Sequence, residues 1–154
     1  MFKNKFNLKD VATGVVCLAV CVVMSCGGSG SGGKSGSVTI AGKTVKVDNE
    51  TWPSASVLAK YGLDGLKKPD GYDKGVVVET AGTMLVINFS AKASTSAAVK
   101  NFFSDNSWEG PMEMNSSEVK LSSYGKEVGD VKFAANFTEM DGLSFQIQIV
   151  KQPL

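Results

Sequence analysis

VKFAANFTEMDGLSFQIQIVK, residues 131–151, decides the fold, because two alternating apolar patterns flank an Asp-Gly pair. Alternation with a period of two is typical of strands that bury one face, and Asp-Gly is a strong signal for a tight hairpin turn. The stretch therefore predicts two antiparallel strands joined at Asp141-Gly142. The predicted core residues are Val131, Phe133, Ala135 and Phe137 on the first strand, and Leu143, Phe145, Ile147 and Ile149 on the second.

Further strand signals precede this hairpin. GVVVET and TMLVINFS are rich in β-branched residues, and the Ala81-Gly82 pair between them predicts a second hairpin. VTIAGKTVKV predicts a third, with its turn at Ala-Gly-Lys. Two shorter segments are ambiguous between strand and loop. In chain order, all these segments are 38–47, 75–80, 83–90, 112–114 and 118–121.

Two other segments have the residue spacing of helices. In ASTSAAVKNFFSDN, an apolar stripe of Val99, Phe102 and Phe103 at i, i+3 and i+4 predicts the main helix at about 94–106. WPSASVLAKYG predicts a short helix at about 53–61, with a proline in its first turn. One main helix across a mostly antiparallel sheet predicts an α+β domain with two layers.

The sheet face opposite the predicted core carries amides, hydroxyls and small groups, and Lys132 is its one charge on the three clearest strands. Such a face can hydrogen-bond a glycan or a protein without burying charge. Trp52 or Trp108 would add a stacking surface. Alternatively, the face is exposed to solvent and binds no partner, or the hairpin at 38–47 covers it. The candidate binding residues are Asn88, Asn136, Gln146 and Gln148.

The composition excludes several kinds of chemistry. The net charge is +1 and all 16 basic residues are lysines, so nothing attracts nucleic acid strongly. There is no histidine, and the three cysteines are Cys17, Cys21 and Cys26. The rest of the chain therefore lacks the ligands that transition metals favour and the groups of a His- or Cys-based nucleophilic site. We expect no metal, no cofactor and no enzyme activity.

Carboxylates are the remaining candidates for acid–base chemistry. Two acids can act as general acid and general base, as they do in glycoside hydrolysis. The spacing of the acids in this chain does not differ from that of acids on a solvent-exposed rim of a domain. A carboxylate-dependent hydrolase is therefore only an alternative. The acids in question are Glu109, Glu113, Glu118, Glu127 and Asp130.

The N-terminus has the layout of a secretory signal, with three lysines in a basic start followed by an uncharged run over 11–25. This run is shorter than the about 20 residues of a membrane-spanning helix. Val23-Met24-Ser25-Cys26 resembles the lipobox of bacterial lipoprotein precursors. The resemblance implies diacylglyceryl transfer to the Cys26 sulfur and cleavage after Ser25. It also implies a protein anchored in the cell envelope that faces the periplasm or the cell exterior.

GSGSGGKS, residues 28–35, matches the phosphate-binding loop pattern G-x-x-x-x-G-K-S. That loop needs a helix beginning at its Lys-Ser pair, whereas the segment that follows is β-branched, so we expect no nucleotide site. As a flexible Gly/Ser coil, residues 27–37 have an r.m.s. end-to-end distance of about 18 Å, which holds a domain near its anchor. The predicted organisation is a cleaved signal peptide over 1–25, a lipidated cysteine with its tether over 26–37, and one domain over 38–154.

These features predict a membrane-anchored envelope lipoprotein with a small, non-catalytic binding or adaptor domain. Its expected partners are the membrane, through the lipid, and a protein or glycan of the envelope. We expect no binding of nucleic acid or nucleotides. A structural or assembly component without a small ligand is the main alternative.

Overall fold

The computed structural model describes residues 36–40, 43–49, 52–80 and 82–154. The predicted signal peptide, Cys26 and the tether up to residue 35 lie outside the described residues. The chain from Gly33 to Leu154 forms one compact unit. Within the described ranges, no helix is long and apolar enough to cross a membrane.

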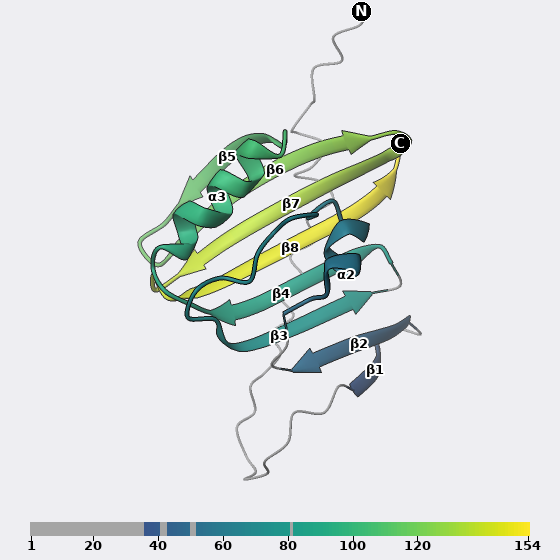
Figure 1. The fold of residues 1–154 in the computed structure, drawn as a ribbon, viewed down its shortest axis with the longest axis horizontal. Coiled ribbons are helices and arrows are strands. Elements are labelled where there is room, and N and C mark those ends of the chain that lie inside the picture. The colour runs from purple at the N-terminus through teal and green to yellow at the C-terminus, as the bar shows by residue number, and fades with distance from the viewer. Residues whose placement is uncertain (1–35, 41–42, 50–51, 81) are drawn as a thin grey trace, which may run out of the picture. The chain divides into compact units, whose positions relative to one another are not determined.

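The described residues form an eight-stranded sheet in which all neighbouring strands pair antiparallel (Figure 1). The order across the sheet is β1-β2-β3-β4-β8-β7-β6-β5, so the last strand of the chain lies near the middle and β1 and β5 form the edges. The predicted antiparallel sheet with a longer and a shorter helix is thereby confirmed. The strands are β1 (Gly36–Ile40), β2 (Lys43–Asn49), β3 (Asp73–Thr80), β4 (Met84–Ser90), β5 (Glu109–Asn115), β6 (Val119–Val128), β7 (Val131–Met140) and β8 (Ser144–Pro153).

The short helix α2 spans Ala55–Lys60. It begins after Pro53 rather than with it, because Ser54 is the N-cap and its hydroxyl accepts a hydrogen bond from the N–H of Val57 at 3.4 Å. The helix ends before Gly62, whose φ of +73° is left-handed. This conformation lets the Gly62 N–H bond back to a carbonyl of the last turn, which closes the helix.

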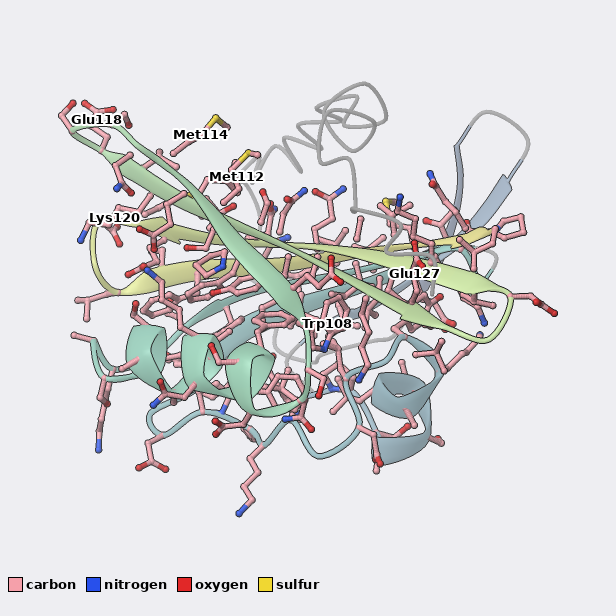
Figure 2. The ribbon with its side chains drawn as sticks, turned by 90° about the horizontal axis from the view of Figure 1, so that it is seen from above. Trp108, Met112, Met114, Glu118, Lys120 and Glu127 are labelled. Atoms are coloured by element: carbon pink, nitrogen blue, oxygen red, sulfur yellow. The ribbon has the colours of Figure 1, made fainter. Side chains whose placement is uncertain are left out.

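The main helix α3 spans Thr95–Asp105, within the predicted range 94–106. It carries the chain from β4, near the middle of the sheet, to β5 at the edge, and it lies on the same side of the sheet as α2 (Figure 2). Val99 and Phe103 are buried, and Phe102 is partly buried against the same core. The apolar stripe is therefore core packing, as its spacing indicates.

The hydrophobic core lies between the two helices and one face of the sheet. Burial alternates along β4, β7 and β8, as the sequence predicts. Phe137 and Ile147 pair in register and are both fully buried, and the Phe145 ring stacks on Phe137 with 5.9 Å between centroids. The core assignment of Leu143 is wrong: this residue is 57% exposed, because it belongs to the turn before β8 begins.

The segment 112–114, which is ambiguous in the sequence, lies within strand β5. Of the other ambiguous segment, 118–121, residues 119–121 begin strand β6, and Glu118 precedes it in a bend. Every residue of β5 is exposed. In contrast, β6 buries Ser122 and Tyr124 and continues to Val128. An edge strand that buries no side chain has no hydrophobic alternation, so only its pairing with β6 identifies β5 as a strand.

The β7–β8 turn has the conformation that its Asp-Gly sequence predicts. Asp141 and Gly142 have φ values of +52° and +75°, as a type I′ turn requires. The Asp141 carboxylate accepts hydrogen bonds from the N–H groups of Leu143 at 3.2 Å and Ser144 at 2.9 Å. These bonds hold the pKa of Asp141 below its ordinary value, because they favour the charged form.

Asp141→Asn should make folding less sensitive to acid. The Asp141 pKa is lower in the folded state than the value of about 3.9 in the unfolded chain. Its charge therefore stabilises the fold above that pH, and this stabilisation is lost as the pH falls through the folded pKa. Asparagine tolerates the left-handed turn but does not titrate. We expect the urea midpoint to fall less between about pH 6 and about pH 2.5 in the variant than in the parent protein.

The matched control for this prediction is Asp130→Asn in the β6–β7 turn. Within the described residues, the Asp130 carboxylate accepts no hydrogen bond. An equal change in both variants would contradict the assignment to the Asp141 hydrogen bonds.

Candidate functional site

The four predicted binding residues lie together on the sheet face opposite the helices. We term this surface, defined by Asn88, Asn136, Gln146 and Gln148, the amide face. Asn88 on β4 lies opposite Gln146 on β8, and Gln148 on β8 lies opposite Asn136 on β7. All four side chains are partly exposed. The pairing of β4 with β8 thus brings residues from separate hairpins into one contiguous group.

Three hydrogen bonds orient the amides, one of them from Nε2 of Gln148 to the sulfur of Met84 at 3.7 Å. Nε2 of Gln146 donates to Oδ1 of Asn88 at 2.8 Å. The Ser123 hydroxyl on β6 donates to Oδ1 of Asn136, also at 2.8 Å. The amide atoms that make no hydrogen bond within the described residues are Nδ2 of Asn88 and Asn136, and Oε1 of Gln146 and Gln148. The group therefore retains both donors and acceptors for a partner.

The amide face is close to neutral along its four central strands, β4, β8, β7 and β6. The charged side chains described there are Lys132 and Glu127, which lie opposite each other at one end of the β6–β7 pair. Its apolar members include Val86 and Val150, which are partly exposed and adjoin the amides through strand pairing. Val78 on β3 has the same side-chain parity but is only 8% exposed. A partner can cover such a surface without the cost of removing unpaired charges from water.

Exposed methionines extend the amide face to the outer strand β5. Met112 lies opposite Ser123 and Met114 opposite Leu121, so both methionines lie on this face and not on the helix side (Figure 2). Met112 is 46% exposed and Met114 is 60% exposed. Methionine is flexible and polarisable, which suits a surface that adapts to a partner. The sequence does not predict this extension, because β5 buries no side chain and lacks a clear strand pattern.

The hairpin at 38–47 does not cover the amide face. Its two strands, β1 and β2, extend the sheet beside β3 instead. The alternative in which this hairpin is a cover is therefore wrong. β1 begins at Gly36, slightly before the predicted start of the domain at residue 38. Both described helices lie on the opposite face (Figure 2).

The acidic residues considered for acid–base chemistry do not form one site. Glu118 and Glu127 lie near opposite ends of β6 (Figure 2). The described residues contain no group of three His, Cys, Asp or Glu side chains that could hold a metal ion. The arrangement resembles a solvated rim. All five of these residues are exposed: Glu109, Glu113, Glu118, Glu127 and Asp130.

An ion cluster under α3, which the sequence analysis missed, engages one of these acids. Nζ of Lys100 is 3.2 Å from Oε1 of Glu113 on β5 and 3.3 Å from Oε1 of Glu139 on β7. Glu139 is only 8% exposed. Burial lowers the pKa of Lys100, but the hydrogen bonds and charges of the two carboxylates outweigh burial and raise it. The cluster therefore ties α3 to two strands through one cation that two carboxylates share.

A cleft of about 630 Å³ lies between the tip of the β5–β6 hairpin and the β7–β8 turn. Glu118, Lys120 and Glu139 are among its lining residues. The buried acid, Glu139, is bound by Lys100, and Glu118 and Lys120 are exposed. In the described part of the chain, the cleft thus offers no unpaired buried acid for proton transfer.

The phosphate-loop pattern at 28–35 lies outside the described residues, but the chain continues from it as strand β1. A phosphate loop needs a helix N-terminus at that point, so the context does not match a nucleotide site. Comparison of the chain with protein-family models, characterised proteins and solved structures finds no match. The function is therefore argued from the amide face and from the N-terminal sequence.

Proposed function

We propose that this protein is a lipid-anchored protein of the bacterial cell envelope, and that its two-layer α+β domain is a non-catalytic binding module. The lipid is attached at Cys26, and the amide face contacts a partner in the envelope. Nine residues, 27–35, separate Cys26 from the start of β1. This short linker keeps the domain near the membrane and raises its effective concentration for a weakly bound partner.

The physical chemistry of acyl chains supports the anchor. A single chain gives only marginal membrane binding, and each buried CH₂ contributes about 0.8 kcal/mol. The diacylglyceryl group that the lipobox resemblance implies would supply two chains, which is enough for stable attachment. The Gly/Ser composition of the following segment suits a flexible spacer.

One observation carries the binding role: the predicted amides lie side by side on a nearly neutral face, on the side of the sheet away from the two described helices. A protein suits this face better than a glycan. Trp52 packs against the core, with 5.7 Å between its ring and that of Phe89, and Trp108 is 5% exposed. Both tryptophan rings therefore pack on the helix side of the sheet. Met112 and Met114, in contrast, supply the apolar surface next to the amides.

Replacing Cys26 by serine should release the protein from the membrane fraction. Serine lacks the sulfur that accepts the diacylglyceryl group, so the precursor should also retain its leader. Membrane partition and the mass of the product measure the two effects. The matched controls are Cys17→Ser and Cys21→Ser, which should change neither. Unchanged partition and processing of the Cys26 variant would refute the anchor.

Lysines on the amide face should remove the partner. The double variant Gln146→Lys, Asn136→Lys adds two charges that an uncharged interface cannot accommodate. We expect the lipidated variant to lose its specific partner in a pull-down from native envelope, while its circular dichroism stays as in the parent. The control, Ala98→Lys with Asn101→Lys, adds the same charge at exposed positions of α3. An unchanged partner set in the first variant would refute the binding role of this face.

A further inference from the structure

We propose that the partner of the amide face is the amide face of a second copy of this chain, so that two sheets stack face to face. This inference rests on the proposed binding role of the face. Aligned packing of two sheets, about 10 Å apart, is a common way to bury a sheet face, and the amide face lies on the side away from the described helices α2 and α3. The features that favour a second copy are hydrogen-bond character, charge, size and symmetry.

The hydrogen-bond character of the face is self-complementary. A twofold interface places the same surface on both sides, so each group must pair with groups of its own kind. Carboxylates or lysines fail this test, whereas a primary amide carries both donors and an acceptor. The Nδ2 donor of Asn136 and the Oε1 acceptor of Gln148 are neighbours through strand pairing, and neither makes a hydrogen bond within the described residues.

The charge of the face also permits self-association. The two charged side chains on the central strands, Lys132 and Glu127, have opposite signs and adjoin each other. Two copies therefore bring no excess of like charge together. A partner of strong charge, such as nucleic acid or an anionic lipid surface, would find no complementary field on this face.

The size of the face is close to what a stable dimer needs. The six strands from β3 to β5 form one continuous surface. With about 4.8 Å between strands and about 3.4 Å per residue over seven residues, its flat footprint is about 700 Å². Side chains raise the accessible area above the footprint, and a standard interface needs about 800 Å² per partner. Met112 and Met114 would supply adaptable apolar contacts at its rim.

The symmetry identifies the residues that would meet. The centre of these six strands lies between β8 and β7, where Gln148 is opposite Asn136. A twofold axis near this point brings each Asn136 close to its counterpart in the other copy. The chain is well suited to a test by cysteine cross-linking, because it has no cysteine after Cys26.

The test uses the full chain with Asn136→Cys in native membranes, oxidised with copper phenanthroline. We expect a covalent homodimer on a non-reducing gel. The matched control Asn101→Cys, exposed on α3 and carrying the same anchor, should stay monomeric. The parent chain, which lacks the cysteine at position 136, shows on the same gel how much dimer forms through Cys26. Adding Gln146→Lys to the Asn136→Cys variant should reduce the dimer by about tenfold or more, because each copy would bring an unpaired charge into the interface.

The outcomes separate this inference from the proposed function. An Asn136→Cys homodimer that is absent from the control supports the inference. An adduct with another protein overturns it and leaves the binding role intact. A variant that stays monomeric also overturns it, whether residues 1–35 or a partner without a thiol cover the face. If, in addition, the double lysine variant keeps every partner of the parent, the binding role fails as well.

Discussion

Phe137→Ala should lower the free energy of unfolding by about 3–5 kcal/mol. The Phe137 side chain is fully buried, and the ring of Phe145 stacks on it with the two planes 5° apart. Ile147 lies directly opposite it on β8. Truncation leaves a cavity between residues held by strand pairing, which cannot collapse to fill it. Urea denaturation of the purified protein, followed by tryptophan fluorescence, measures the loss.

Leu143→Ala is the matched control for this prediction. The alternating pattern of the sequence assigns both Phe137 and Leu143 to the core, but Leu143 is 57% exposed in the turn. Its truncation should therefore change the free energy of unfolding by no more than about 0.5 kcal/mol. A loss of several kcal/mol at Leu143, or none at Phe137, would contradict the observed boundary between turn and strand.

Lys100→Met should lower the free energy of unfolding by about 2–3 kcal/mol at neutral pH. Removing one partner of a buried ion pair costs about 3–5 kcal/mol, and the expected value is reduced here because water reaches the cation. The side chain of Lys100 is 31% exposed and that of Glu139 is 10% exposed. Methionine retains the apolar stem of lysine, so the loss reports the charge. Urea denaturation at several pH values measures it.

The pH dependence of this loss distinguishes a buried charge from a packing defect. The hydrogen bonds and charges of Glu113 and Glu139 hold the pKa of Lys100 above its ordinary value. The Lys100 charge therefore stabilises the fold below the unfolded value of about 10.4, and this stabilisation is lost as the pH rises through the folded pKa, so the difference between parent and variant should shrink in strong alkali. The control Lys120→Met removes a cation that lies opposite Glu139 but makes no ion pair with it among the described contacts. Equal losses in the two variants would contradict the assignment.

The sequence predicted the local elements because their signals are local. The Asp141-Gly142 turn, the alternation along β7 and β8 and the stripe on α3 each depend on residues near one another in the chain. The misplacement of Leu143 shows the limit of this reasoning. Alternation tells which side chains share a face, but it does not tell where a turn ends and a strand begins.

Elements with a weak sequence pattern are identified only by their tertiary contacts. β5 buries none of its side chains, so its sequence EGPMEMN carries no burial signal. It is a strand because β6 pairs with it. The Lys100 cluster was missed for a related reason: Glu113 and Glu139 lie on strands that pairing with β6 brings beneath α3. No sequence spacing relates these three residues.

The sequence predicted which residues belong to the candidate site, but it did not predict how those residues are arranged. Strand parity alone assigned Asn88, Asn136, Gln146 and Gln148 to the face away from the core. The hydrogen bond between Asn88 and Gln146 joins residues 58 positions apart, and it exists because β8 is inserted between β4 and β7. Strand pairing likewise brings Ser123 and the two methionines of β5 onto this face.

By itself, the sequence determined which side chains share a face of each strand, where the clearest turn lies and which chemistries lack the residues they need. Only the tertiary structure decided which strands are neighbours, and so which polar groups form one surface. The physical reason is that side-chain parity follows from the geometry of a single chain segment. Strand order, in contrast, results from the burial of apolar area between segments that are distant in the chain.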